Sequence, residues 1–314
     1  MSNNEIFIHK DRKPEIPEFI IERDDEEKEK EKQGVPERKL SFFQRHKWLR
    51  RLLKALAVVL LVALTIGAYK AWNYYYHIGI SVSTTPSENI NKLKTAPAKE
   101  TAQVVHTSDS ILGVELDFYA IHGLRASIEF KEPKLTDKSV YLYCRSADHK
   151  GDNTYLGSLV VNGEEKQSDG SRFGYMAMVD DRMVIGVESR REEVKDYVME
   201  NGGSYFRQYI LVSNRVIPTQ FELHGKVERK AIGRMNIGGK ERLYFISTRN
   251  KETLWDFADA LREYGFIDAI YITGGTDYCY YRTADGQRHD IGDINDYPHK
   301  KWKGVIPWLV LRKR

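Results

Sequence analysis

The sequence contains very little cysteine, and no cysteine or histidine lies in a metal-binding pattern. Two cysteines, Cys144 and Cys279, occur in 314 residues, which excludes a disulfide-rich scaffold. Both lie in stretches of strand-like composition, so they either pair in an oxidising compartment or remain buried free thiols. Because no set of cysteines and histidines has the spacing of zinc ligands, we expect no structural metal site, and no motif specifies a cofactor.

A large excess of charge is lacking as well. The formal net charge is +4 at pH 7, and much of the basic excess flanks one apolar segment. A surface that binds nucleic acid needs a basic stripe that can follow the phosphates. We therefore expect no nucleic-acid partner.

Long apolar runs are absent except for one, which extends from Leu52 to Trp72 and reads LLKALAVVLLVALTIGAYKAW. Its uninterrupted part, 55–69, is short for a hydrocarbon core of about 30 Å. Lys54 and Lys70 lie near its two ends, where their stems can stay in lipid while the ammonium groups reach water. With these flanks the segment reaches spanning length, so we predict one transmembrane helix in contact with the lipid bilayer.

Two other interpretations of this segment are weaker. A buried helix of a soluble protein normally keeps a polar face, and residues 55–64 have none. A cleaved signal peptide normally lies at the N-terminus, whereas about 50 residues precede this segment, and no small-residue cleavage pattern follows it.

Charge and aromatic residues around the span predict its orientation. Trp48 on one side, and Trp72 with 74–76 on the other, are typical of interfacial belts. Positive charge is retained in the cytoplasm, so the basic flank predicts a cytoplasmic N-terminus and an extracytoplasmic C-terminal domain at the inner (plasma) membrane. The basic flank consists of Arg45, Lys47, Arg50, Arg51 and Lys54.

Composition divides the chain into four parts. Residues 1–44 include the mixed-charge run ERDDEEKEKEK and have no apolar face, which predicts a disordered cytoplasmic tail whose partner the sequence does not specify. Residues 45–77 hold the basic flank and the span, and 78–112 have the composition of a linker. Residues 113–314 hold most of the 19 tyrosines and 12 phenylalanines and predict one folded domain.

The domain has the pattern of an α+β fold with mixed, mostly antiparallel sheets and a few helices. Strand patterns such as VELDFYAI, SVYLYC and GYMAMVDD dominate from Val114 onward. A first helix is predicted from Ser189, with a capping box that ends on Glu192, to a stop at 201–202. A second is predicted after Asn250 as N-cap, and 266–273 then reads as a buried strand. The second helix has a core-facing stripe of Leu254, Phe257, Ala258 and Leu261 and ends at Gly265.

Two glycine loops are the candidate sites. Paired glycines let a ligand approach the backbone and expose N–H groups to anions, and a nearby arginine can clamp a phosphate or carboxylate. The alternative is structural, since a helix stop and a tight turn also use paired glycines. The first loop is Asn201-Gly202-Gly203-Ser204, followed by Arg207 and Gln208; the second is Thr273-Gly274-Gly275-Thr276-Asp277.

Three ordered motifs after about Arg172 resemble the phosphodiester glycosidase family, whose lysosomal member removes N-acetylglucosamine to uncover mannose 6-phosphate. NGGSYFRQYILVSN is similar to the family's Asn-Gly-Gly-Phe-Phe region and the strand after it. RKAIGRMNIGGKERLYFIST is similar to its Arg-x-Ala-Ile-Gly strand pair, with Arg234 as the matching arginine. ETLWDFADALREYGFIDAIYITGGTDYCYY is similar to its helix, buried strand and Gly-Gly loop. The resemblance covers somewhat under half of the chain.

One departure from the family concerns its chemistry. The family's glycine loop usually carries an aspartate directly before the two glycines, and here that position is Thr273. Glycosidic cleavage assigns its acid, base and nucleophile roles to carboxylates. Asp277, four residues later, is the remaining candidate for a catalytic carboxylate.

The resemblance implies one of two functions. The first is a membrane-anchored phosphodiester glycosidase-like hydrolase of a sugar phosphodiester or glycoconjugate of the cell envelope, with Asp277 as acid or base. The second is a non-catalytic, membrane-tethered domain that binds glycans or an envelope partner. The expected substrate-binding residues are Asn201, Gly202, Gly203, Arg207, Gln208, Arg234, Thr273, Gly274 and Gly275.

Overall fold

The structure is a computed structural model that describes residues 47–77, 86–97, 99–146, 154–188, 192–218, 221, 223–299 and 306–314. The chain divides into two compact units, 1–62 and 63–314. The tail predicted over 1–44, the flanking Arg45, the cap residue Ser189 and the aromatic side chains of 72–76 lie outside the described set. The long helix and the globular part are therefore taken separately.

The long helix α2 spans Lys47–His77 and contains the predicted membrane segment. Its stretch Trp48–Ala71 has 24 residues, and an 18-residue window within it has a mean hydropathy of 2.3 and no buried residue. At a rise of about 1.5 Å per residue, this length exceeds a hydrocarbon core of about 30 Å. By length and composition, the helix can cross a membrane.

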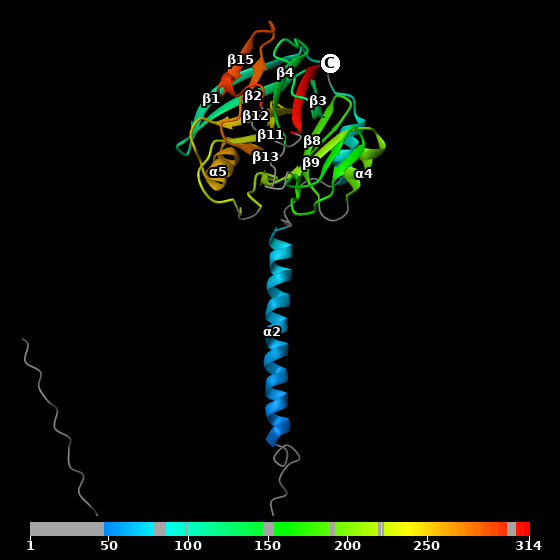
Figure 1. Cartoon of the computed structure of the whole chain (residues 1–314), viewed down its shortest axis with the longest axis vertical. Helices are drawn as coiled ribbons and strands as arrows, with labels where there is room; N and C mark the ends of the chain where they lie inside the picture. Colours follow the sequence, from blue (N-terminus) through cyan, green and yellow to red (C-terminus); the bar gives the residue numbers. More distant parts are fainter. Residues whose placement is uncertain are drawn as a thin grey trace, which may run out of the picture. The chain divides into compact units, whose positions relative to one another are not determined.

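The globular part is built from three antiparallel sheets and a few helices, as the α+β prediction requires (Figure 1). Listed in spatial order, the first sheet is β1 (Gln103–Ile111), β2 (Val114–His122), β12 (Lys240–Thr248), β11 (Arg229–Ile237), β13 (Asp268–Gly274) and β10 (Ile210–Val212). The second is β15 (Arg288–Ile291), β14 (Cys279–Arg282), β4 (Val140–Arg145), β16 (Trp308–Lys313) and β3 (Leu124–Glu129). The third is β6 (Glu164–Gln167), β5 (Leu159–Val161), β9 (Ser204–Gln208), β7 (Gly174–Val179) and β8 (Arg182–Val187).

A central apolar core joins the three sheets. It takes Ile270 from the first sheet, Leu309 from the second and Phe206 from the third. Strand β13 contributes to two cores, because Ile270 and Ile272 face the central core while Ala269 and Tyr271 pack on the opposite side. The predicted buried strand is thus confirmed, and it is covered on both faces.

Helix α5 (Leu254–Tyr264) covers the outer face of β11 and β13 (Figure 1). The four stripe residues predicted to face the core are all 0% exposed. Gly265 ends the helix with a φ of 105°, as predicted. The predicted N-cap, Asn250, is wrong: the cap is Thr253, whose side chain accepts a hydrogen bond from Asp256 N.

Helix α4 (Glu193–Glu200) lies beside β9 and ends at Asn201, the predicted stop (Figure 1). The capping-box prediction is wrong in register, because Glu192 is the N-cap residue and not the third residue of the helix. The Glu192 side chain instead forms ion pairs with Lys195 and Arg207. The two ion pairs fix the Glu192 carboxylate beside strand β9 of the third sheet.

The folded part begins before Gly113, which corrects the predicted linker 78–112. Helix α3 (Pro86–Lys94) buries Leu93 against the third sheet, and Asn89 Nδ2 donates a 2.5 Å hydrogen bond to Tyr175 Oη. Strand β1 pairs with β2 along its whole length. The polar composition suggested a linker because six residues of β1 in succession face solvent.

Cys144 and Cys279 are free, buried thiols in the central core. The sequence left open either a disulfide or two buried free thiols, and the structure has the free thiols. Burial raises the pKa of the Cys279 thiol to about 11 and that of Cys144 well above its ordinary value.

Phe257→Ala tests the packing of α5. Phe257 is 0% exposed, so its truncation leaves a cavity and is expected to cost about 3–5 kcal/mol of unfolding free energy. Denaturant unfolding followed by tryptophan fluorescence measures the loss. Glu263→Ala in the same helix is the control, because Glu263 is exposed. Equal stability of the two variants would contradict the position of α5.

Candidate functional site

The first glycine loop has a structural role. Asn201 is exposed, and its Nδ2 donates to Tyr197 O of its own helix at 2.8 Å. A Cβ on Gly203 would collide with Met178 O, so the close approach of β7 requires glycine here. Gly202 continues the turn, with its N–H on Met199 O. In the described part of the chain this loop lines none of the cavities discussed below.

Arg207 does not face an open site. It is 2% exposed, and its Nε donates a 2.6 Å hydrogen bond to Tyr205 Oη. Its Nη2 lies 3.7 Å from Glu188 Oε2 and 3.2 Å from Glu192 Oε1. The guanidinium is therefore committed to internal carboxylates, which argues against the predicted phosphate contact.

Gln208 points to the opposite face of β9 and is also inaccessible. It is 0% exposed, and its Oε1 accepts from Tyr209 N at 3.0 Å. Among the described residues, Nε2 has no hydrogen-bond partner. Gln208 lines none of the three cavities described for this part of the chain, so the structure gives it no role in a ligand site.

Arg234 lies at the wrong end of β11 to join Asp277. Its Nε donates to the buried Asp268 at 2.9 Å, and its Nη1 pairs with Glu241. Lys230 faces the same side of the strand four residues earlier, which separates the two by about 13 Å. The sequence grouped Arg234 with the glycine loops, and the structure separates them.

The second glycine loop forms the turn that carries Asp277. Gly275 has a φ of 100°, which favours glycine, and its N–H donates to Glu228 O at 2.9 Å. Gly274 closes β13 and packs against Tyr271 and Val227. Thr273 is 1% exposed and does not line the cleft described next. The predicted tight turn is present, and Asp277 is its functional candidate.

Asp277 is held by an arginine that sequence reasoning did not select. Arg145, at the end of β4, donates from Nη1 to Asp277 Oδ2 at 2.7 Å. The Arg145 side chain is 4% exposed and that of Asp277 is 21% exposed. A charge-assisted bond of this length fixes the position of the carboxylate. The exposed part of Asp277 faces a cleft.

This cleft, of about 220 Å³, brings together acidic, basic and hydroxyl side chains from β2, β11, β12 and the turn after β13. Lys230 is central to it, because its Nζ donates to Gly275 O at 2.9 Å and to Asp277 O at 3.0 Å. An ammonium group has three donors, so one remains for a ligand. The lining residues are Asp117, Glu228, Lys230, Ser247, Thr248, Arg249, Thr276, Asp277, Ile291 and Gly292.

The opposite wall of the cleft is an ion-pair network around Asp117. Arg249 Nη2 donates to Asp117 Oδ1 at 2.9 Å, Ser108 Oγ donates to the same oxygen at 2.6 Å, and His106 Nε2 lies 2.9 Å from it. Burial opposes ionisation of Asp117, but the bonds from Arg249, Ser108 and His106 outweigh it and lower its pKa. Asp117 is therefore a charged, structural part of the wall.

Sequence reasoning missed the cleft residues other than Asp277 and Thr276. Lys230 and Glu228 had a usable signal, since they lie in and beside the Arg-Lys-Ala-Ile-Gly motif. Arg145 had none, because 132 residues separate it from Asp277. Within the described ranges, no group of three or more His, Cys, Asp or Glu side chains is placed to hold a metal ion.

Comparisons with known proteins give a distant likeness. No family model matches the sequence, and no curated protein matches it. The zebrafish N-acetylglucosamine-1-phosphodiester alpha-N-acetylglucosaminidase catalytic domain, auto-inhibited by its pro-peptide, is 14% identical with a TM-score of 0.45, over 71% of this chain and 86% of that one. A hypothetical protein from Synechocystis is 10% identical with a TM-score of 0.47, over 69% of this chain and 64% of that one. At these values the likeness assigns no residue a role.

Glu188→Gln tests whether an ionisable Glu188 is buried beside Arg207, through the pH dependence of the folding stability. Burial raises the pKa of Glu188 above its ordinary value of 4.5, so the folded state holds this proton more tightly than the unfolded state does. The wild-type chain is expected to lose stability relative to the variant as pH rises from 4.5 through the raised pKa. Above that pKa the difference becomes constant.

Thermal unfolding midpoints of both chains, measured between about pH 4 and about pH 8, give this difference. The exposed Glu193→Gln is the control and follows the wild type at every pH. A difference between Glu188→Gln and wild type that is independent of pH would contradict the burial of an ionisable Glu188.

Proposed function

We propose that this chain is a membrane-anchored, extracytoplasmic hydrolase of a sugar phosphodiester or related envelope glycoconjugate, with its active site at the Asp277 cleft. The observation that carries the proposal is the buried Arg145, which fixes Asp277 at the mouth of a cleft also lined by Glu228 and Lys230. The three sequence motifs supply the substrate class. The long apolar helix and its basic flank supply the anchor and its orientation.

Each cleft residue has a role in this proposal. Lys230 holds the phosphodiester anion, because it is the cleft cation without a carboxylate partner among the described residues. Asp277, with Oδ2 on Arg145 and Oδ1 unbonded within the described set, acts as base or nucleophile. Glu228 is the second carboxylate and protonates the leaving oxygen, as glycosidic cleavage requires. Arg145 is a positioning residue.

Asp277→Asn is the direct test of this assignment. Turnover of a panel of glycosyl 1-phosphodiesters by the full chain is expected to fall by roughly a hundred- to ten-thousandfold, because a positioned acid or base contributes on this order. Asp196→Asn is the matched control, since Asp196 is exposed on α4 and lines neither the Asp277 cleft nor the larger cavity described below. Undiminished turnover in Asp277→Asn would remove Asp277 from the mechanism.

A second candidate function is a tethered, non-catalytic binder of glycans. Its support is that Arg207 is enclosed by Glu188 and Glu192, and that the cleft is smaller than the roughly 300–1,000 Å³ of ordinary ligand sites. This candidate predicts saturable binding of envelope polysaccharide fragments without product. Reproducible cleavage that depends on Asp277 would exclude it.

Antibody labelling of membrane vesicles tests the proposed orientation of the chain in the membrane. An antibody to a C-terminal epitope is expected to bind sealed right-side-out membrane vesicles, whereas one to an N-terminal epitope binds only after permeabilisation. The basic flank before the apolar helix is the physical reason. The reverse pattern of labelling would place the cleft in the cytoplasm and contradict an envelope substrate.

A further inference from the structure

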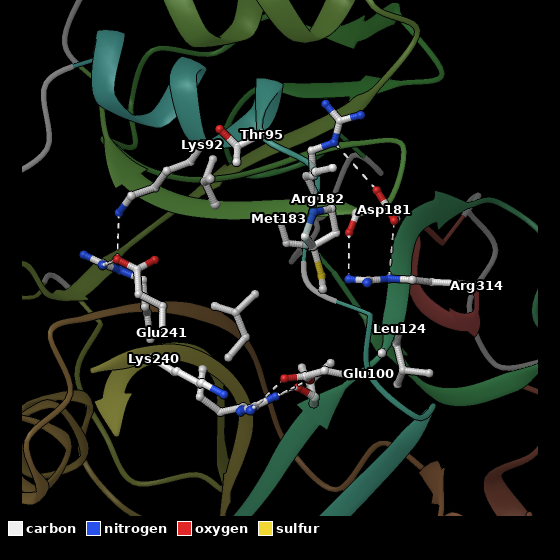
Figure 2. Close-up of a pocket in the computed structure, with 18 of the residues that line it drawn as sticks. Lys92, Thr95, Glu100, Leu124, Asp181, Arg182, Met183, Lys240, Glu241 and Arg314 are labelled. Atoms are coloured by element: carbon white, nitrogen blue, oxygen red, sulfur yellow. Dashed lines mark hydrogen bonds and ion pairs between the residues drawn. The ribbon is translucent and has the colours of Figure 1, made fainter. Parts of the chain in front are cut away.

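A second and larger cavity lies away from Asp277, at the other end of β11. Its volume is about 630 Å³, within the usual range of roughly 300–1,000 Å³ for small-molecule sites. Its walls come from α3, residues 95–97 and 100, the start of β8, the β11–β12 hairpin and Arg314 (Figure 2). None of its lining residues lines the Asp277 cleft.

The charges of this cavity form three clusters around its rim. Glu241 accepts from both Lys92, at 2.8 Å, and Arg234. Asp181 lies between Arg182 and Arg314 (Figure 2), and its two carboxylate oxygens are 3.6 Å from Arg182 Nε and 3.5 Å from Arg314 Nε. Arg242 donates through both terminal nitrogens to Glu100, at 2.6 and 3.1 Å.

Positive charge exceeds negative charge in this lining. Six basic and four acidic side chains line the cavity, and Arg182 and Arg234 also pair with Asp180 and Asp268, which lie outside the lining. Lys240 is exposed at the rim and makes no ion pair within the described residues. Arg234 is fixed from beneath by Asp268, which is 1% exposed. Lys240 is therefore the lining cation that is left for a ligand among the described residues.

Between the charged clusters the lining is aliphatic. Leu124 and Leu243 contribute to it together with Met183. No aromatic side chain lines the cavity, so it offers no ring on which a sugar could stack. A ligand that matches both parts has a negatively charged head and an aliphatic body.

We propose that this cavity is a second ligand-binding site, which takes a small organic anion with an aliphatic body. Lys240 binds the head, because it is the lining cation without an ion-pair partner among the described residues. The aliphatic lining desolvates the body. The site is separate from the Asp277 cleft and does not depend on hydrolysis there.

Calorimetric titration of the full chain in lipid nanodiscs tests the proposal, with hexanoate as the probe and empty nanodiscs as the blank. Hexanamide has the same aliphatic body without the charge and is expected to bind at least about tenfold more weakly, because hydrogen bonds to a charged group are the stronger ones. Equal binding of the two compounds, or no binding of hexanoate, overturns the proposal.

Charge reversal at the rim assigns binding to this cavity. Lys240→Glu is expected to weaken hexanoate binding by about fivefold, the scale of an exposed ion pair, and to leave the unfolding midpoint unchanged. Lys240→Arg keeps the affinity. Lys251→Glu, an exposed lysine outside every described cavity, is the matched control. Unchanged binding in Lys240→Glu places hexanoate elsewhere and overturns the assignment.

Asp277→Asn separates this proposal from the hydrolase. The variant is expected to bind hexanoate as the wild type does, whatever happens to its turnover. If Asp277→Asn loses hexanoate binding while its unfolding midpoint is unchanged, the two sites are not independent and the proposal of a second site fails.

Discussion

Strand β13 is held on both edges and both faces, and the position of the candidate site depends on it. Its edges pair with β10 and β11, and its faces pack against the central core and against the α5 layer. Asp268 at its start anchors Arg234, and Gly275 just after its end turns the chain to Asp277. A strand enclosed in this way cannot shift its register without exposing apolar side chains. The turn that carries Asp277 therefore starts from a fixed position.

Three of the buried arginines pair with carboxylates, and these pairs have two different consequences. Arg207 and Arg234 satisfy internal carboxylates, and removal of either would leave a buried charge without its partner. Arg145 also pairs with a carboxylate, but its partner Asp277 is partly exposed at a cleft. The same type of interaction therefore stabilises the fold in two places and orients the carboxylate of the candidate site in the third.

The sequence predicted local features well and long-range partners poorly. The stripe of α5, its stop at Gly265 and the glycine turn after β13 depend on neighbouring residues, and the structure has them. The contact between Arg145 and Asp277 depends on how β4 and β14 pair, which no local pattern encodes. The glycines of 202–203 were misleading for a related reason, since close packing on β7 requires Gly203 and a φ of 64° favours glycine at 202, both without a ligand.

The most direct test of the account is a structure of the full chain with a non-hydrolysable sugar phosphodiester analogue bound. The account predicts that the phosphodiester lies in the Asp277 cleft, with a phosphate oxygen on Lys230 Nζ and the glycosidic carbon facing the carboxylate that Arg145 holds. An analogue bound at the 201–207 loop, or one bound only in the larger cavity beside Lys240, would contradict the assignment of the active site to Asp277.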